Sequence, residues 1–229
     1  MLLALALPPA SAAVRDYYFT PLGSQKGLAQ NSVTAFAQDS QGFIWVGTQG
    51  GLHRYDGQRY VVLRHDPSDP TSLPDSFITA LAATEDDTLW VGTYARYVSR
   101  LDVRSGRIER FDAGDADAGG AQVMALLPQR DRLWIGTLNG LARMDPATGR
   151  SVQVVRLEPR LLRQMPQQQL LEDVDGTVWY ASAAGLFRID AAGEVALVGP
   201  PERTRSLVLD RSGQLWVGRH DGLHRLRPD

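Results

Sequence analysis

The sequence predicts an all-β protein built from about five copies of one small antiparallel sheet. The first observation is a recurring phrase, Trp-apolar-Gly-Thr or a close variant, whose tryptophans lie 37 to 45 residues apart. The second is a turn signal before each tryptophan, and the third is an apolar run around it. A period of this size is typical of repeat architectures, in which each unit buries its apolar faces against its neighbours. The tryptophans are Trp45, Trp90, Trp134, Trp179 and Trp216.

A hairpin turn is predicted before each tryptophan strand. Three copies have an aspartate six residues before the tryptophan, at Asp39, Asp173 and Asp210, and a glycine three residues before it. Copies two and three carry Asp87 and Asp131 in place of that glycine. Gly and Asp tolerate positive φ, and the earlier aspartate can accept hydrogen bonds from the turn backbone. We therefore expect two antiparallel strands joined by this turn.

Two further strands complete each unit. The tryptophan strand is apolar at consecutive positions, as in Ile44-Trp45-Val46, which is typical of a strand covered on both faces. An Arg-x-Asp strand follows, such as Arg54 to Asp56, and then a fourth strand, such as 107–111. Four short strands in about 40–45 residues match one blade of a β-propeller. An apolar residue is expected seven places after each tryptophan, at Leu52, Tyr97, Leu141, Leu186 and Leu223.

The predicted blades cover nearly the whole chain. They lie near residues 31–66, 75–112, 121–157, 165–199 and 203–229. Two arrangements remain open. One is a closed five-bladed ring sealed by a closing strand at 15–21, and the other is an incomplete arc of a seven-bladed ring with exposed sheet edges. The five tryptophans are interpreted as structural fillers between blades, because residues shared by all copies serve the fold. The Arg and Asp of the Arg-x-Asp strands are interpreted as ion pairs between blades.

The composition excludes several classes of site. The formal net charge is −2, with 24 basic and 26 acidic residues, so no nucleic-acid partner is expected. The absence of cysteine excludes disulfides, thiolate metal sites and a cysteine nucleophile. Of four histidines, His53 and His224 share one repeat position, which favours a scaffold role. No histidine spacing indicates converging ligands, so we expect no metal and no cofactor.

Residues 1–13 resemble a secretory signal peptide. An apolar run over 1–7 is followed by Pro-Pro-Ala-Ser-Ala-Ala, with cleavage expected after Ala12 or Ala13. No basic residue precedes the apolar run, which fits a truncated signal. Residues 14–229 are then expected to be propeller repeats located in the periplasm or elsewhere outside the cytoplasm. No later stretch approaches the ~20 apolar residues that span a bilayer.

The first copy, from Asn31 to Gly57, resembles the two-component regulator propeller repeat. The phrases that carry this resemblance are Asn-Ser-Val at 31–33, Asp-Ser-Gln-Gly-Phe-Ile-Trp-Val-Gly-Thr at 39–48 and Gly-Leu-His-Arg-Tyr-Asp-Gly at 51–57. The resemblance extends over about residues 15–229 and is weakest in the fourth copy, at Trp179 to Ser182.

The resemblance implies the extracytoplasmic sensor domain of a bacterial hybrid histidine kinase or diguanylate cyclase. Such a domain binds a small molecule, with carbohydrate fragments as one known type of ligand. The kinase or cyclase activity, the contact with the membrane and any dimerisation would reside in downstream segments. The chain itself is then expected not to be an enzyme.

Ligand-binding residues are expected where the copies differ. The variable positions follow the Gly-Thr phrase or precede the first strand of a unit, and several are amides, arginines or aromatics that can hold a sugar or an acidic sugar. Ordinary polar loop chemistry is the alternative for this set. It comprises Asn31, Gln49, Tyr94, Arg96, Gln122, Asn139, Arg205, Arg219 and His220.

Two other functions remain open. Propeller enzymes of the streptogramin lyase and lactonase types use similar short repeats, but they place His, Glu and a divalent metal in the channel. The histidines of this sequence do not align in that way. A secreted protein-interaction scaffold is the other alternative, and an apolar patch on one face would favour it.

Overall fold

The computed structural model describes residues 18–95, 97–113, 122–158 and 168–226 of the chain. The predicted signal peptide, residues 1–13, and the candidate ligand residue Arg96 lie outside these ranges. Within them the protein has nineteen strands and one short 3₁₀ helix, η1 (Ser24–Lys26). The predicted all-β class is therefore confirmed.

The described strands form five antiparallel sheets, each with its strands in sequence order. The first two sheets contain β1 (Val33–Gln38), β2 (Ile44–Thr48), β3 (Gly51–Tyr55), β4 (Tyr60–Leu63), β5 (Ile78–Ala83), β6 (Thr88–Thr93), β7 (Tyr97–Asp102) and β8 (Ile108–Asp112). The next two contain β9 (Val123–Pro128), β10 (Leu133–Thr137), β11 (Gly140–Met144), β12 (Ser151–Arg156), β13 (Gln169–Glu172), β14 (Val178–Ser182), β15 (Gly185–Ile189) and β16 (Val195–Val198). The fifth contains β17 (Thr204–Leu209), β18 (Leu215–Arg219) and β19 (Gly222–Arg225).

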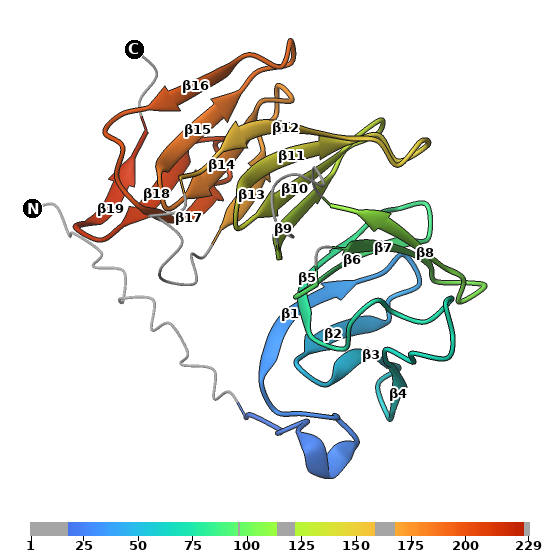
Figure 1. The fold of residues 1–229 in the computed structure, drawn as a ribbon. Coiled ribbons are helices and arrows are strands. Elements are labelled where there is room, and N and C mark those ends of the chain that lie inside the picture. The colour runs from blue at the N-terminus through green and yellow to red at the C-terminus, as the bar shows by residue number, and fades with distance from the viewer. Residues whose placement is uncertain (1–17, 96, 114–121, 159–167, 227–229) are drawn as a thin grey trace, which may run out of the picture.

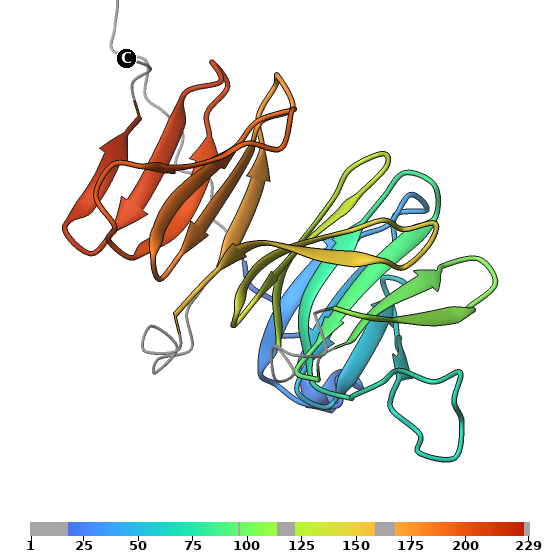
Figure 2. The ribbon, with the colours of Figure 1, turned by 45° about the horizontal axis from the view of Figure 1, so that its top comes forward.

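The sheets stand side by side along an arc (Figures 1 and 2). The sheet β1–β4 lies at one end and β17–β19 at the other. The first strands β1, β5, β9, β13 and β17 contact one another in that order, so they line the inner side of the arc. Four of these strands shift register where they begin, which indicates a β-bulge at the same place in each.

An apolar cluster lies between each pair of neighbouring sheets. Each cluster contains the tryptophan of the earlier sheet and apolar residues of the later one, as with Trp45 beside Leu89 and Val91. Four of the five tryptophans are between 2% and 7% exposed, whereas Trp216 in the last sheet is partly exposed. A flat indole suits this position because it fills the wide gap between two sheets.

A leucine or valine accompanies each tryptophan on the same face. Leu52, Leu141 and Leu186 are at most 1% exposed and belong to the clusters between sheets. In the second sheet the prediction of Tyr97 for this place is wrong. Tyr97 is 37% exposed, and Val98 takes the buried position. The turn before β7 has one residue more than its equivalents, which moves the pattern by one place.

The aspartate of the predicted turn also holds the tryptophan. Asp39 accepts hydrogen bonds from the backbone N–H groups of Gln41 and Phe43, both at 3.0 Å, as expected for this turn. Its other oxygen accepts the indole N–H of Trp45 at 2.7 Å. Asp210 and Trp216 repeat the contact at 2.8 Å. The turn and the orientation of the indole are thus fixed within one hairpin.

The Arg-x-Asp strands differ from the prediction. Asp56 accepts hydrogen bonds from the backbone of Gln58 and Arg59 in the turn that follows it, each at 2.9 Å. The Arg54 guanidinium lies 5.0 Å from the centre of the Phe43 ring in its own sheet. Arg100 pairs with Glu109, also of its own sheet. The predicted ion pairs between blades are wrong for these residues, since turn capping, stacking and an ion pair within one sheet take their place. The contact of Arg100 with the next sheet is a hydrogen bond to the Pro146 carbonyl at 3.2 Å.

The described part of the predicted closing strand is not formed. Residues 18–21 lie in no strand, and Tyr18 and Phe19 are more than 90% exposed. Residues 15–17 lie outside the described ranges. The chain that follows is held against the first sheet, where Tyr60 donates to the Leu22 carbonyl at 3.0 Å. Among the described residues, β19 therefore has no fourth strand beside it.

A buried histidine also anchors this N-terminal segment. His53 is fully buried, and its Nε2 accepts the Ala29 backbone N–H at 2.9 Å while Nδ1 lies 3.2 Å from the Val46 carbonyl. Burial lowers the pKa of the imidazole below its ordinary value of 6.5, and the charge of Arg64 acts in the same direction. The neutral form is therefore favoured in the folded state.

This shift predicts a loss of stability in mild acid. Between the lowered pKa and 6.5 the unfolded chain binds the proton that the folded chain rejects, so the free energy of unfolding falls as the pH drops through this window. Urea denaturation above and below pH 6.5 measures the effect. The variant His53→Gln is expected to flatten this dependence. If the free energy of unfolding changed equally with pH in the native chain and in His53→Gln, the assignment of this pH dependence to His53 would be contradicted.

Candidate ligand-binding site

The arc of sheets has two ends where turns gather. The front end carries the turns β2–β3, β6–β7, β10–β11, β14–β15 and β18–β19, together with the segments leading into the first strands. The back end carries the turns that join each first strand to its tryptophan strand. The predicted ligand residues that the structure describes all belong to the front end.

At the first sheet, two predicted residues hold the N-terminal segment in place. The Gln49 side-chain oxygen accepts a hydrogen bond from Gln30 Nε2 at 2.9 Å. The Asn31 side-chain oxygen accepts the Ser24 backbone N–H at 2.8 Å. The side-chain oxygen of each of these amides therefore already accepts a hydrogen bond within the protein. Both side chains lie at the front end beside the start of β1.

The middle sheets offer an aromatic platform and two amides. Tyr94 stacks on Phe77, with ring centres 5.0 Å apart and planes 7° from parallel, and it is 38% exposed. The backbone carbonyls of Gln122 and Asn139 accept hydrogen bonds from Leu138 and Leu157. Their positions next to β9 and β11 place both residues at the front end.

The last sheet brings two arginines to one strand end. Arg219 pairs with Thr204, the residue before Arg205, across β17 and β18. Arg205 and His220 are exposed, whereas Arg219 is partly buried. Arg96, the third arginine among the predicted ligand residues, lies outside the described residues.

Four buried polar atoms at the front end have no hydrogen-bond partner among the described residues. They are Gln30 Oε1, Thr79 Oγ1, Gln168 Oε1 and Arg219 Nε. Thr79 lies in the bulge of β5, and Gln168 immediately precedes β13, where its Nε2 donates to the Thr137 carbonyl at 2.7 Å. An unpaired buried polar atom costs about 1–3 kcal/mol, so such atoms call for a partner.

Sequence reasoning did not select Thr79 or Gln168. The sequence did contain a signal for them. Both residues lie just before or within the first strand of a sheet, as do the predicted ligand residues Gln122 and Arg205. Thr79 lies in the bulge of β5, which follows from the register of two strands rather than from the order of residues.

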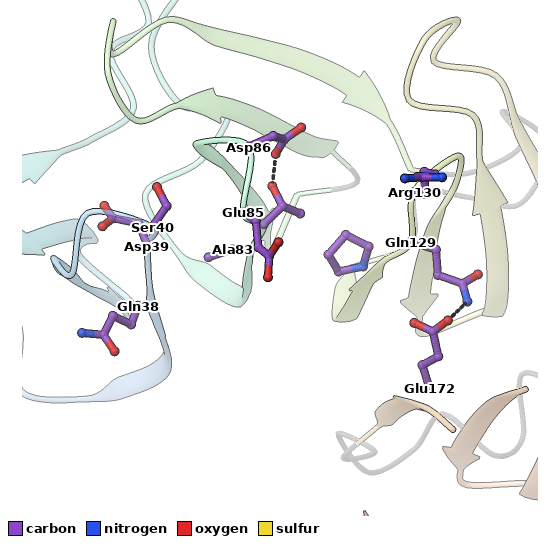
Figure 3. Close-up of a pocket in the computed structure, with 11 residues that line it drawn as sticks. Gln38, Asp39, Ser40, Ala83, Glu85, Asp86, Gln129, Arg130 and Glu172 are labelled. Carbon is purple, nitrogen blue, oxygen red and sulfur yellow. Dashed lines mark hydrogen bonds between the residues drawn. The ribbon is translucent and has the colours of Figure 1, made fainter. Parts of the chain in front are cut away.

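A cavity of about 830 Å³ lies at the back end. Figure 3 shows its walls, which come from the turns β1–β2, β5–β6 and β9–β10 and from the end of β13. Gln129 Nε2 donates to Glu172 at 2.7 Å across two neighbouring sheets. The lining residues are Gln38, Asp39, Ser40, Ala83, Thr84, Glu85, Asp86, Pro128, Gln129, Arg130 and Glu172.

The chemistry of the back-end cavity is acidic and polar. Four residues with carboxylates, Asp39, Glu85, Asp86 and Glu172, line the cavity together with Arg130, and no aromatic residue is among the described residues of the lining. Asp39 is already committed to its own turn and to Trp45. Across the described ranges, no three His, Asp or Glu residues are placed to hold a metal ion.

The repeats match a known family model. The description of that model is two component regulator propeller, and it matches residues 27–50 and 72–95, which include the phrases around Trp45 and Trp90. These two segments of the chain are two-component regulator propeller repeats. The resemblance stated from the first copy is thereby confirmed.

A segment of this propeller-repeat chain is similar to a curated kinase. Over 55 residues it is 44% identical to histidine kinase P4 of Formosa agariphila. That segment makes up 24% of this chain and 4% of the kinase. The chain therefore spans a small fraction of the length of the curated relative that it matches.

Solved structures share the propeller fold with this repeat chain. An extracellular domain assigned to a one component system of B. thetaiotaomicron is 20% identical, with a TM-score of 0.68 over 87% of this chain and 28% of its own. Another, from a hybrid two component system of the same organism, is 20% identical, with a TM-score of 0.60 over 90% of this chain and 35% of its own. The chain thus spans about a third of these extracellular domains.

The same fold also occurs in an enzyme. A catalytically inactive virginiamycin B lyase from Staphylococcus aureus, solved with quinupristin, is 15% identical. It has a TM-score of 0.65 over 86% of this chain and 67% of its own. At this level of identity the likeness concerns the fold alone. Among the described residues of the propeller-repeat chain, no helix has the length and apolar character needed to cross a membrane.

Proposed function

We propose that this chain is the ligand-binding sensor module of a bacterial two-component or cyclic-di-GMP signalling receptor, located in the periplasm or elsewhere outside the cytoplasm. The observation that carries the proposal is the match of two repeats to the two-component regulator propeller model. It is supported by the segment shared with a histidine kinase and by the fold shared with extracellular domains of bacterial signalling systems. The signalling enzyme would belong to another domain of such a receptor.

The front end is the proposed ligand site. Its unpartnered buried atoms are both acceptors and donors, at Gln168, Thr79 and Arg219, which suits a ligand rich in hydroxyl groups. The adjacent Arg205 and Arg219 favour a ligand that also carries a carboxylate. An acidic oligosaccharide fragment combines these properties, and the exposed Tyr94 offers a surface on which a sugar ring can stack.

Calorimetric titration of the full chain with neutral and uronic-acid oligosaccharides tests this proposal. We expect the uronic-acid series to bind, and Arg219→Gln to weaken binding by about tenfold or more, because a guanidinium–carboxylate contact is lost. The matched control is Glu172→Gln at the back end, which is expected to leave binding unchanged. The oligosaccharide is expected to be recovered intact.

Three outcomes would overturn the proposal. Loss of binding in Glu172→Gln but not in Arg219→Gln would move the site to the acidic cavity at the back end. Cleavage of the oligosaccharide during incubation would favour a lyase-type function over sensing. Failure of both series to bind would contradict the assignment of acidic carbohydrate as the ligand class.

A further inference from the structure

A pocket of about 300 Å³ lies between the first and second sheets, and we call it the Arg54 pocket. One wall comes from β2, β3 and β4, and the other comes from the end of β7 and the turn that follows it. Its lining shares no residue with the back-end cavity or with the predicted ligand residues of the front end. The apolar part of the lining comprises Trp45, Val61, Leu63, Leu101 and Val103.

The pocket holds a positive charge that has no counter-charge among the described residues. The Arg54 guanidinium lies 5.0 Å from the centre of the Phe43 ring and 6.0 Å from that of Trp45. Within the part of the chain that the structure describes, the Arg54 side chain makes no hydrogen bond and no ion pair. The other arginine of the lining, Arg104, is paired through Nε with Asp87 at 2.6 Å. The aromatic rings thus place the Arg54 guanidinium and leave its N–H groups for a ligand.

Equivalent pockets elsewhere in the molecule contain carboxylates. Arg54, Arg100 and Arg143 hold the same place, because each pairs across strands with the tryptophan of its own sheet. Arg100 and Arg143 line pockets of about 250 and 320 Å³. No Asp or Glu is among the described residues that line the Arg54 pocket. The acidic residues of the other two are Asp102 and Glu109 beside Arg100, and Asp131 and Asp145 beside Arg143.

The second sheet shows where a carboxylate sits beside this arginine. Glu109 lies opposite Arg100 on β8 and accepts a hydrogen bond from its Nε at 3.0 Å. This hydrogen bond is the main reason that the pKa of Glu109 lies below its ordinary value. The residue opposite Arg54 on β4 is instead Val61. The first sheet therefore keeps the arginine and lacks the acid.

The third sheet satisfies its arginine from a different direction. Val152 lies opposite Arg143, as Val61 lies opposite Arg54, but Asp131 and Asp145 line the same pocket. The hydrogen bond from Arg132 is the main cause of the lowered pKa of Asp131, and the charge of Arg143 acts in the same direction. A difference of this kind between otherwise equivalent repeats indicates function at the position that differs.

We propose that the Arg54 pocket is a second ligand site, which takes a small carboxylate with an aromatic or branched apolar body. The ligand carboxylate would pair with Arg54 in the place that Glu109 takes beside Arg100, and the apolar body would lie against Val61, Leu63 and Leu101. The pocket has room for about ten non-hydrogen atoms, at the ~30 Å³ that one water occupies in the liquid.

Calorimetric titration of the full chain with phenylacetate tests the proposal. We expect phenylacetate to bind, and we expect both phenylacetamide and acetate to bind at least about tenfold more weakly. Phenylacetamide keeps the apolar body without the charge, whereas acetate keeps the charge without the body. Arg54→Gln is expected to weaken phenylacetate binding by about tenfold or more, and Arg143→Gln, at the equivalent place in the third sheet, is expected to leave it unchanged.

A second pair of variants tests the site without removing an arginine. Val61→Glu places a carboxylate opposite Arg54, so it is expected to occupy the guanidinium and to weaken phenylacetate binding by about tenfold or more. Val152→Glu makes the same change opposite Arg143 and is expected to leave binding unchanged. Val61 and Val152 are 44% and 52% exposed, so both variants are expected to keep the fold.

Four results would overturn the proposal. They are equal affinity for phenylacetate and phenylacetamide, native affinity for phenylacetate in Val61→Glu, an equal loss of affinity in Val152→Glu, and failure of the native chain to bind either phenylacetate or 4-methylpentanoate. Binding of uronic-acid oligosaccharides at the front end is expected to be unchanged in Val61→Glu. The two ligand sites therefore stand or fall separately.

Discussion

Replacing Trp134 by alanine is expected to lower the free energy of unfolding by about 3–5 kcal/mol, the range found for large aromatic side chains in cores. The indole is 2% exposed and lies in the cluster between the third and fourth sheets. Its N–H also donates to the Gln129 side chain at 2.7 Å, so the substitution leaves that acceptor without its partner. Chemical denaturation of the two chains measures the difference.

The matched control is Trp216→Ala in the last sheet. This tryptophan occupies the equivalent strand position and makes an equivalent bond to Asp210, but it is partly exposed. We expect less than half of the loss found for Trp134→Ala, because no described sheet packs over its ring. Equal losses at the two positions would show that the indoles stabilise their own hairpins and not the contacts between sheets.

Replacing Gly140 by alanine is expected to be about as damaging, at ~3 kcal/mol or more. Gly140 has φ of +130°, which residues with a side chain rarely adopt. A Cβ there would also lie 1.9 Å from the Val155 carbonyl oxygen, in the neighbouring strand β12. Relief would require β11 and β12 to separate, and this would break ladder hydrogen bonds of the third sheet.

Gly222→Ala separates the two causes of this loss. Gly222 begins β19 as Gly140 begins β11, and its φ of +134° is nearly the same. A Cβ at Gly222 would meet nothing within 4 Å, so only the backbone strain remains, which costs about 1–3 kcal/mol. Thermal unfolding of both variants measures the contrast. A loss at Gly222 as large as at Gly140 would mean that dihedral strain, and not the clash with β12, decides the effect.

The features that the sequence predicts best are those confined to one hairpin. The aspartate turn before Trp45 requires only residues 39–45, and the structure confirms its hydrogen bonds to the backbone. The bond from the indole to Asp39 was not predicted, although the spacing of the two residues, which three copies share, was its signal. The error at Tyr97 came from one inserted residue in a turn, which moves every later position of that strand to the other face of the sheet.

The candidate site was harder to predict for a physical reason. Its residues come from different sheets and meet only after the arc has formed, so no local pattern fixes their distances. The positions of Asn31, Gln49 and Tyr94 at the front end follow from the strand order, but their hydrogen bonds and stacking were visible only in the structure. The cavity at the back end was not predicted, because its lining was interpreted as turn chemistry alone.

The bond between Asp39 and Trp45 has a consequence for the order of folding. Both residues belong to one hairpin, so the ring can be oriented before the second sheet has been synthesised. Each completed hairpin then gives the next one an ordered surface to pack against. The contacts between sheets join segments that are adjacent along the chain. Structure is thus expected to grow during translation from the N-terminal side, with little need for distant parts of the polypeptide to find one another.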